Sequence, residues 1–421
     1  MASGFGAYRE VLGPSEARAF TLAGIAARLP MSMTGLGIVL LIAITTGSYG
    51  RAGLVTAVAT LITAVAAPWW GRLIDQIGQA RVLIAATVIY NLSVGALITT
   101  VLLHAPFAVT LITALGVGLG FSSAGACVRA RWSYRLRGKP LLNTAFAWEA
   151  VLDEVVFMIG PVLATFLATS LHPSLGLAAG GLVGLVGALA LASQRRTEPP
   201  LKSRVDRRSR SSRLSAGLLV PIVLACTALG VPLGGMEVVI IAFAGEAGIL
   251  PYAGFIVMAW AIGSLIAAVL TGTIAWTAPP TKRFRIAAML LAVSLVPLPF
   301  VVHPLPIAGL LILSGLFIAP TLIASVAVTQ DAVPADRLTE ALGWTSMGLA
   351  GGVGLGAAVL GQVVDIGGSQ AGFYGAIAAG LVLIVAALCV RTRTTPDGIT
   401  RVRPDTSPAD PEPAGAQTPF P

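Results

Sequence analysis

The sequence predicts an all-α membrane protein with twelve transmembrane helices, and three observations lead to this prediction. The 421-residue chain is 56% hydrophobic and only 11% charged, with mean hydropathy +0.88, so a soluble core could not hide its apolar surface from water. The apolar residues form long continuous segments, whereas the strands of a membrane barrel would be ~10-residue stretches of alternating polarity. All of the 27 basic residues except Arg28 and Arg51 fall in every second gap between these segments.

Twelve segments are long enough to span a membrane, which requires about 20 mainly apolar residues per helix. The first follows a polar N-terminal stretch and is longer than the apolar part of a signal peptide, so we expect it to be retained as a helix. Five more precede a polar stretch near the middle of the chain, and six follow it. In chain order the predicted helices span residues 19–45, 51–71, 82–103, 105–128, 143–170, 173–193, 215–243, 249–275, 286–302, 304–328, 339–364 and 370–390.

The basic residues predict how the chain is oriented, because short cytoplasmic loops carry an excess of Lys and Arg. The richest predicted loops are Arg129–Lys139 and Arg195–Arg213, and both lie on the same predicted side as the two termini. We therefore predict a multi-pass protein of the cytoplasmic membrane with both termini in the cytoplasm. Because the basic residues are spread over separate loops, the net charge of +9 indicates contact with the lipid bilayer and no nucleic-acid partner.

The stretch from Arg195 to Arg213 divides the predicted helices into two groups of six. The groups repeat weakly at an offset near 200, as in the matches of Pro30 with Pro232 and of Gly160 with Gly361. This repeat predicts two pseudo-symmetric six-helix bundles around an axis normal to the membrane. The predicted organisation is a cytoplasmic N-terminus (1–18), a first bundle (19–193), a basic cytoplasmic loop (194–214), a second bundle (215–390) and a disordered cytoplasmic tail (391–421).

No pattern in the sequence indicates enzyme chemistry, a metal site or a cofactor. The three cysteines are isolated and the three histidines are dispersed, so neither type has the spacing of a metal site. The glycine runs at 116–120 and 352–356 lie within apolar helices with no preceding strand, and therefore predict helix packing and not a nucleotide loop.

The segment from Gly71 to Arg81 is the most distinctive local pattern, in the predicted turn between the second and third helices. Gly71 would allow close helix contact, Gly78 would allow a tight turn, and Asp75 would place a carboxylate near a helix N-terminus. Together with Arg81, these residues resemble motif A of the major facilitator superfamily (MFS).

The resemblance implies the MFS fold and a role for Asp75. In this superfamily the equivalent acid faces the start of the eleventh helix, here near 338–342, and holds the cytoplasmic side closed in the outward-facing state. This sequence has Gln76 and Gln79 where basic residues are usual, and it has Glu340 near that helix start. We therefore expect this cytoplasmic contact to be weaker than is typical.

Gly160 and Pro161, in the predicted fifth helix, resemble motif C of the same superfamily, which marks antiporters and bends the fifth helix against the eighth. Ala164 and Thr165 replace the expected glycine pair, so the alternative is that Pro161 only bends the helix. The arginine that the superfamily often places in the fourth helix is absent from 110–125.

Ionisable residues within membrane spans are costly, and each is therefore a candidate for function. Arg28 lies about 14 Å into the first helix, and Asp153 and Glu154 lie at a similar depth in the fifth, so we predict that Arg28 pairs with one of the two acids. The other would face a cavity and carry a proton. We expect Glu149 to pair with basic residues of the loop that ends at Lys139, and Glu237 in the seventh helix is a second candidate for binding a proton or cation.

The prediction from sequence is thus a secondary active transporter of the MFS that exports a small molecule in exchange for protons by alternating access. Two alternatives remain open. One is an importer that uses proton symport, and the other is a membrane sensor or scaffold that transports nothing.

Overall fold

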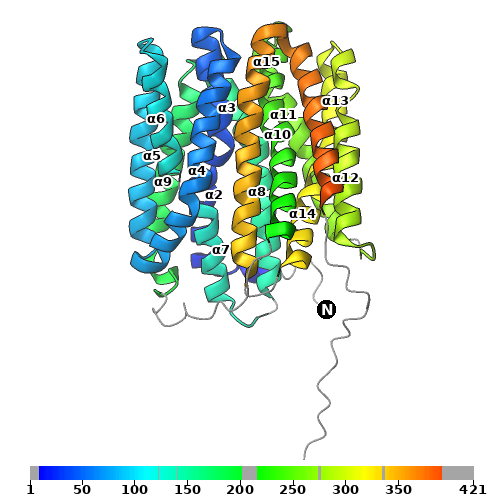
Figure 1. Ribbon diagram of the computed structural model, residues 1–421. Coiled ribbons are helices and arrows are strands. Elements are labelled where there is room, and N and C mark those ends of the chain that lie inside the picture. The colour runs from blue at the N-terminus through cyan, green and yellow to red at the C-terminus, as the bar shows by residue number, and fades with distance from the viewer. Residues whose placement is uncertain are drawn as a thin grey trace, which may run out of the picture.

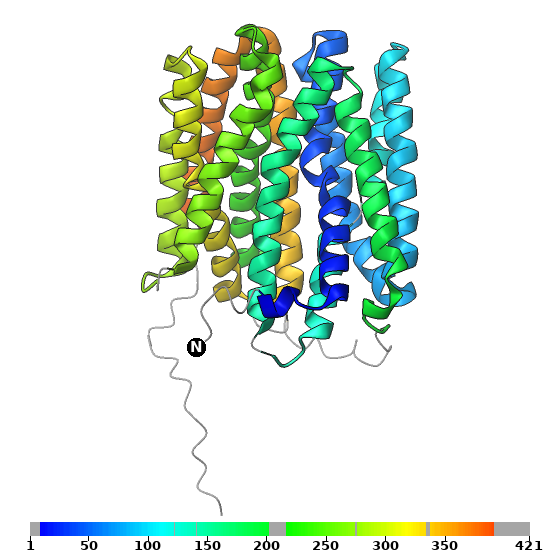
Figure 2. The same cartoon turned by 180° about the vertical axis from the view of Figure 1, so that it is seen from behind.

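The computed structural model describes residues 9–121, 123–139, 141–201, 216–273, 276–333 and 337–390. Over these residues the regular elements are all helices, and most stand side by side across one bundle (Figures 1 and 2). The predicted tail (391–421), most of the predicted central loop (202–214) and the first eight residues lie outside the described residues.

The first half of the chain forms six helical spans. The first is broken between α2 and α3 because Pro30 begins α3 and offers no backbone N–H. Gly47, at φ 71°, ends α3, and the Ser48 side chain caps α4 by accepting a hydrogen bond from Arg51 N. The elements are α2 (Ser15–Arg28), α3 (Pro30–Thr46), α4 (Tyr49–Ile77), α5 (Gln79–Leu102), α6 (Phe107–Gly120), α7 (Ala124–Arg135), α8 (Leu141–Ser170) and α9 (Leu175–Ser193).

The second half repeats this arrangement. Its elements are α10 (Ala216–Glu246), α11 (Ala253–Thr273), α12 (Pro280–Ser294), α13 (Pro304–Gly315), α14 (Ile318–Ala332) and α15 (Leu338–Cys389). α15 contains two spans, because Gly367 and Gly368 leave helical geometry and Gly368 has φ 71° and ψ −172°. Figure 1 shows the chain rising along the first part of α15 and descending along the second.

The predicted fold class is confirmed. Within the described ranges, 11 helical segments are long and apolar enough to cross a membrane, and the last of them, Glu340–Cys389, crosses twice because of its break. This gives the two six-helix groups that hydropathy predicted, with boundaries that differ by a few residues.

The two ends of the bundle can be told apart by the turns and chain ends that lie at each. The turn at Gly78, the segment 195–201 and both ends of the described chain lie at one end, which we call the basic end (Figures 1 and 2). The turns at Gly47 and Gly368 lie at the other, which we call the opposite end.

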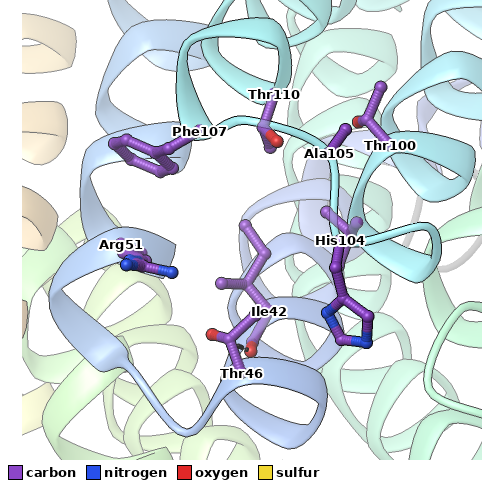
Figure 3. Close-up of a pocket in the computed structure, with 9 residues that line it drawn as sticks. Ile42, Thr46, Arg51, Thr100, His104, Ala105, Phe107 and Thr110 are labelled. Atoms are coloured by element: carbon purple, nitrogen blue, oxygen red, sulfur yellow. Dashed lines mark hydrogen bonds between the residues drawn. The ribbon is translucent and has the colours of Figure 1, made fainter.

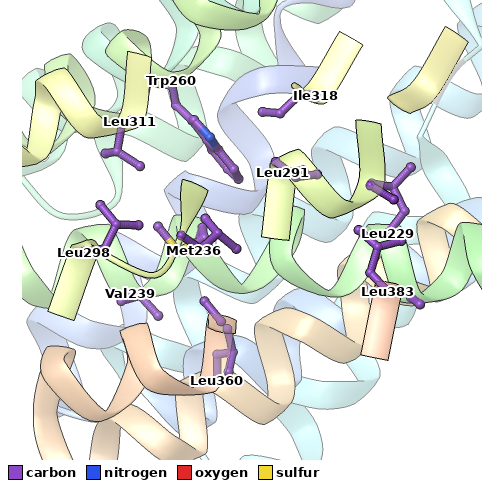
Figure 4. Packing of buried hydrophobic residues seen from close by; sticks show 14 of the residues in the cluster. Leu229, Met236, Val239, Trp260, Leu291, Leu298, Leu311, Ile318, Leu360 and Leu383 are labelled. Atoms are coloured by element: carbon purple, nitrogen blue, oxygen red, sulfur yellow. The ribbon is translucent and has the colours of Figure 1, made fainter. Parts of the chain in front are cut away.

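The core of the second half consists of apolar side chains from several helices. Figure 4 shows Leu229, Met236 and Val239 of α10 lying among side chains of α11, α12, α13 and α15. A separate cluster joins the halves, because Leu36 and Val55 of the first half share it with Ile241 of the second. The halves therefore meet through a packed apolar core and not only through polar contacts.

The two halves press together along α4 and α15 near the opposite end. A Cβ on Gly53 would lie 2.0 Å from the carbonyl oxygen of Ala357, and one on Gly361 would lie 2.5 Å from that of Tyr49. Only glycine fits at these positions, as is usual where membrane helices approach closely. Toward the basic end α4 leans away from α15 (Figure 1), and a Cβ on Gly71 would have no neighbour within 4 Å.

We expect Gly53→Val to destabilise this conformation by about 1–3 kcal/mol or more, because the added methyl groups would overlap the backbone at Ala357. The matched control is Gly71→Val on the same helix, where the space is open. Thermal unfolding of the two purified variants, followed by intrinsic fluorescence, gives the comparison. Equal melting temperatures would contradict the close contact.

Candidate functional site

A cavity of about 480 Å³ lies between the two halves of the bundle. Its wall is formed by α3, α4, α6 and α8 of the first half and by α10, α11, α14 and α15 of the second. The volume is within the range of small-molecule sites, about 300–1,000 Å³. A site lined by both halves is also the place where a movement of one half against the other would change access.

Two carboxylates line this cavity, one from each half. Glu154 lies on α8 in a stripe with Phe157 and Pro161, which follow at three and seven residues and also line the cavity. Glu237 lies on α10, facing Gly35 of α3, and a Cβ on Gly35 would be only 3.3 Å from Glu237 Oε2. The glycine thus leaves room for the carboxylate at the boundary between the halves.

The rest of the wall is apolar, aromatic or hydroxylated. The described residues that line the cavity include no Lys, Arg or His. Phe121 and Trp260 add aromatic surface, and Thr56 Oγ1 is buried without a hydrogen-bond partner in the described structure. The hydroxyl of Thr34 is already engaged by Tyr90 at 2.6 Å.

Arg28 is held in an ion-pair cluster separate from the cavity. Its guanidinium contacts Glu149 Oε2 at 2.7 Å and Asp153 Oδ1 at 2.7 Å, and its Nε donates to Gly24 O. Arg28 is 3% exposed and Glu149 is fully buried. Asp153 also pairs with Arg129. The cluster joins α2, α7 and α8 within the first half, so its contacts position helices.

The structure therefore separates the predicted mid-membrane charges. Arg28 and Asp153 lie together, whereas Glu154, one position further along α8, faces the cavity. The expectation for Glu149 is wrong, because its partners are Arg28 and the indole N–H of Trp132, which donates at 2.8 Å. The signal was in the spacing, since residues 149 and 153 are one helical turn apart and face the same way.

The motif A-like segment differs from its predicted form. α4 continues to Ile77, so Gly71 and Asp75 lie within its last turns and not in a loop. Gly71 makes no close helix contact, because this stretch of α4 lies away from its neighbours on that side. Gly78, at φ 94° and ψ 159°, forms the whole junction with α5, a conformation that glycine adopts readily.

Glu198, which was not predicted as a site residue from the sequence, caps α5 at this junction. The Glu198 carboxylate accepts hydrogen bonds from Gln79 N and Ala80 N, and it lines a surface groove with Arg81 and Arg195. An acidic residue shortly after the sixth span was the available signal, but nothing in the sequence shows which helix it reaches.

Gly160 and Pro161 both lie at close contacts of α8. A Cβ on Gly160 would overlap Ser32 of α3, and a Cβ on Gly254 of α11 would lie 2.4 Å from Pro161 O. The fifth span therefore packs closely against the eighth at Pro161, which also lines the cavity.

A second, smaller pocket of about 80 Å³ lies at the opposite end, entirely within the first half. Figure 3 shows Arg51, His104 and Phe107 around it, and the Arg51 guanidinium lies 5.8 Å from the centre of the Phe107 ring. Because it is small and touches only one half, it is not the candidate transport site.

Comparison with known proteins agrees with this architecture. Residues 20–308, and again residues 250–417, match the sequence model of the Major Facilitator Superfamily. The chain belongs to this superfamily. It is therefore a multi-pass membrane transporter and not an enzyme.

Solved structures of transporters share the fold. A mutant of the nucleoside transporter NupG matches with a TM-score of 0.69 at 16% identity, covering 88% of this chain and 99% of that one. A bacterial homologue of the iron transporter ferroportin matches in its inward-facing state with a TM-score of 0.64 (16% identity, 90% and 100% covered). Its outward-facing state gives 0.58 (15% identity, 88% and 98% covered). No curated protein sequence matches this chain significantly.

Proposed function

We propose that the protein exports a small molecule across the cytoplasmic membrane in exchange for protons. The observation that carries this proposal is the central cavity with one carboxylate from each half, Glu154 and Glu237. A carboxylate that faces a cavity within the membrane can bind a proton on one side and release it on the other. Direction and antiport are supported by the motif C-like pair Gly160 and Pro161.

In this proposal, residues 19–193 rock against residues 215–390 so that the cavity opens to each side in turn. The contact of α4 with α15 near the opposite end, with α4 leaning away toward the basic end, supports a conformation open at the basic end. The basic end would face the cytoplasm, with both termini, as the distribution of Lys and Arg predicts.

The test is proton-coupled flux in proteoliposomes that carry an imposed pH gradient and an internal pH-sensitive dye. Compounds are added singly from a panel of organic cations, sugars, nucleosides and ferrous iron, the last two because structurally similar proteins transport nucleosides and iron. We expect one class to dissipate the gradient.

We expect Glu154→Gln and Glu237→Gln each to reduce this response at least tenfold, because the amide cannot carry a proton. Glu16→Gln is the matched control, since Glu16 is half exposed and pairs only with Arg135 among its described contacts. Full proton-coupled flux in both cavity variants would overturn the proposed coupling. Compound flux that persists without proton movement would indicate a uniporter.

A further inference from the structure

We propose that the cargo is a monovalent organic cation with an apolar body, and that Glu237 binds its charged group. This inference deepens the proposed function, since it names the substrate class of the same cavity. It rests on the charged residues that line the cavity, on the apolar and aromatic residues of its wall, and on the position of Glu237 against Gly35.

The charges that line the cavity favour a cationic cargo. The cavity has two carboxylates and, within the described part of its wall, no basic side chain. The nearby buried base, Arg28, is already neutralised by Glu149 and Asp153. An anionic cargo would therefore meet like charge in a low-dielectric site without compensation, whereas a cation would be stabilised there.

The surface between the carboxylates indicates the rest of the cargo. Phe121, Phe157 and Trp260 line the same cavity, and apart from the two acids the other lining residues are mainly apolar, with six Ser and Thr hydroxyls among them. An aromatic face attracts a nearby cation by about 0.5–2 kcal/mol, and the apolar wall favours an apolar body. A small, strongly hydrated metal ion would gain little from such a wall.

The position of Glu237 favours it over Glu154 as the residue that binds the cationic group of the cargo. Glu237 lies where α10 meets α3 of the other half, and Gly35 leaves just enough room for its carboxylate. A cation held at this boundary contacts both halves at once, so its binding can bias their relative position. Thr56, also from the first half, adds a buried hydroxyl that lacks a partner among the described residues.

The test measures binding to the purified full-length protein in an uncharged detergent, by equilibrium dialysis. Two probes of nearly the same size and shape are compared, the tetraphenylphosphonium cation and the tetraphenylborate anion. We expect saturable binding of the cation, weakened at least tenfold by Glu237→Gln and less by Glu237→Asp, which keeps the charge. Tetraphenylborate should show no saturable binding to the wild type, because the two carboxylates repel an anion, and the Glu154→Gln/Glu237→Gln double variant should bind it at least as well.

Thermal unfolding of each variant establishes that it is folded, and Glu16→Gln again serves as the matched control. Cation binding that is unchanged in Glu237→Gln and Glu237→Asp, or saturable binding of tetraphenylborate to the wild type, would overturn the inference. Because binding needs no proton gradient, this result is independent of the flux experiment. Binding of the cation without proton-coupled transport would leave the substrate class standing and refute only the coupling.

Discussion

Replacing Arg28 with Met is expected to destabilise the first half by about 3–5 kcal/mol, the largest effect that we predict for a single substitution. Arg28 is the partner of Glu149, whose carboxylate is fully buried. Removing the guanidinium leaves that carboxylate without a counter-charge among the described residues, and Asp153 then retains only Arg129 of its described ion-pair partners. Thermal unfolding and size-exclusion chromatography of the purified variant would measure the loss.

The control for this prediction is Arg129→Met. Arg129 pairs with the same Asp153 but is 44% exposed, so we expect its loss to cost about 1 kcal/mol or less. The double variant Arg28→Met/Glu149→Gln should recover much of the stability, because it removes the buried charge together with its partner. If Arg28→Met and Arg129→Met were equally stable, the buried cluster would not have the importance that we assign to it.

Replacing Asp365 with Asn is expected to open the opposite end of the bundle. The Asp365 carboxylate, on α15, accepts hydrogen bonds from Tyr49 N at 2.7 Å, Gly50 N at 2.9 Å and the Ser48 hydroxyl at 2.7 Å. It therefore caps α4 of the other half, where the positive end of the helix dipole favours a negative charge. Asn keeps one acceptor oxygen but loses the charge, at a cost of about 1.5–3 kcal/mol, which shifts the equilibrium between states roughly 10- to 100-fold.

Spin-label distances measured by pulsed EPR would detect this shift. Spin labels are attached at Leu103→Cys in the first half and Val302→Cys in the second, both at the opposite end. The native side chains are 74% and 83% exposed. The exposed native Cys389 is replaced by Ser in this background. In Asp365→Asn we expect the population with the longer distance to grow.

Glu246→Gln provides the matched control for Asp365→Asn. Glu246 also accepts hydrogen bonds at the opposite end, from the backbone and hydroxyl of Ser369, but both residues belong to the second half. Removing the Glu246 charge should therefore not change the distance between the spin labels on the two halves. An unchanged distance distribution in Asp365→Asn would show that the halves stay closed without this carboxylate.

The sequence predicted helices and depths well, and contacts between distant segments poorly. Membrane depth alone was enough to predict that Arg28 lies near Asp153, because the two residues lie at similar distances along helices that start from the same predicted side. Successive residues of an α-helix point about 100° apart, which explains why Asp153 contacts Arg28 while Glu154 faces the cavity. In contrast, Asp365 and Glu198 cap helices that lie more than a hundred residues away in the chain. Such pairings depend on tertiary packing and leave no local pattern.

The predicted turn at Gly71 was wrong for a related reason. The polar residues of that segment suggested a loop at the membrane surface, but α4 continues for several residues beyond its apolar part. Hydropathy reports where a helix leaves the apolar layer and not where it ends. The helix ends at Ile77, and Gly78 after it takes a backbone conformation that few other residues adopt.

The cap on α4 has a consequence for how this protein can change during evolution. Two of the three groups that Asp365 binds are backbone amides, which every residue except proline supplies. A substitution at position 49 that the packing tolerates would leave its hydrogen bond in place, whereas a change at 365 would remove both at once. At position 50 a Cβ would lie 2.8 Å from Asp365 Oδ2, so this position favours glycine. We therefore expect related sequences to vary more freely at position 49 than at positions 50 and 365, with proline excluded from both amide positions.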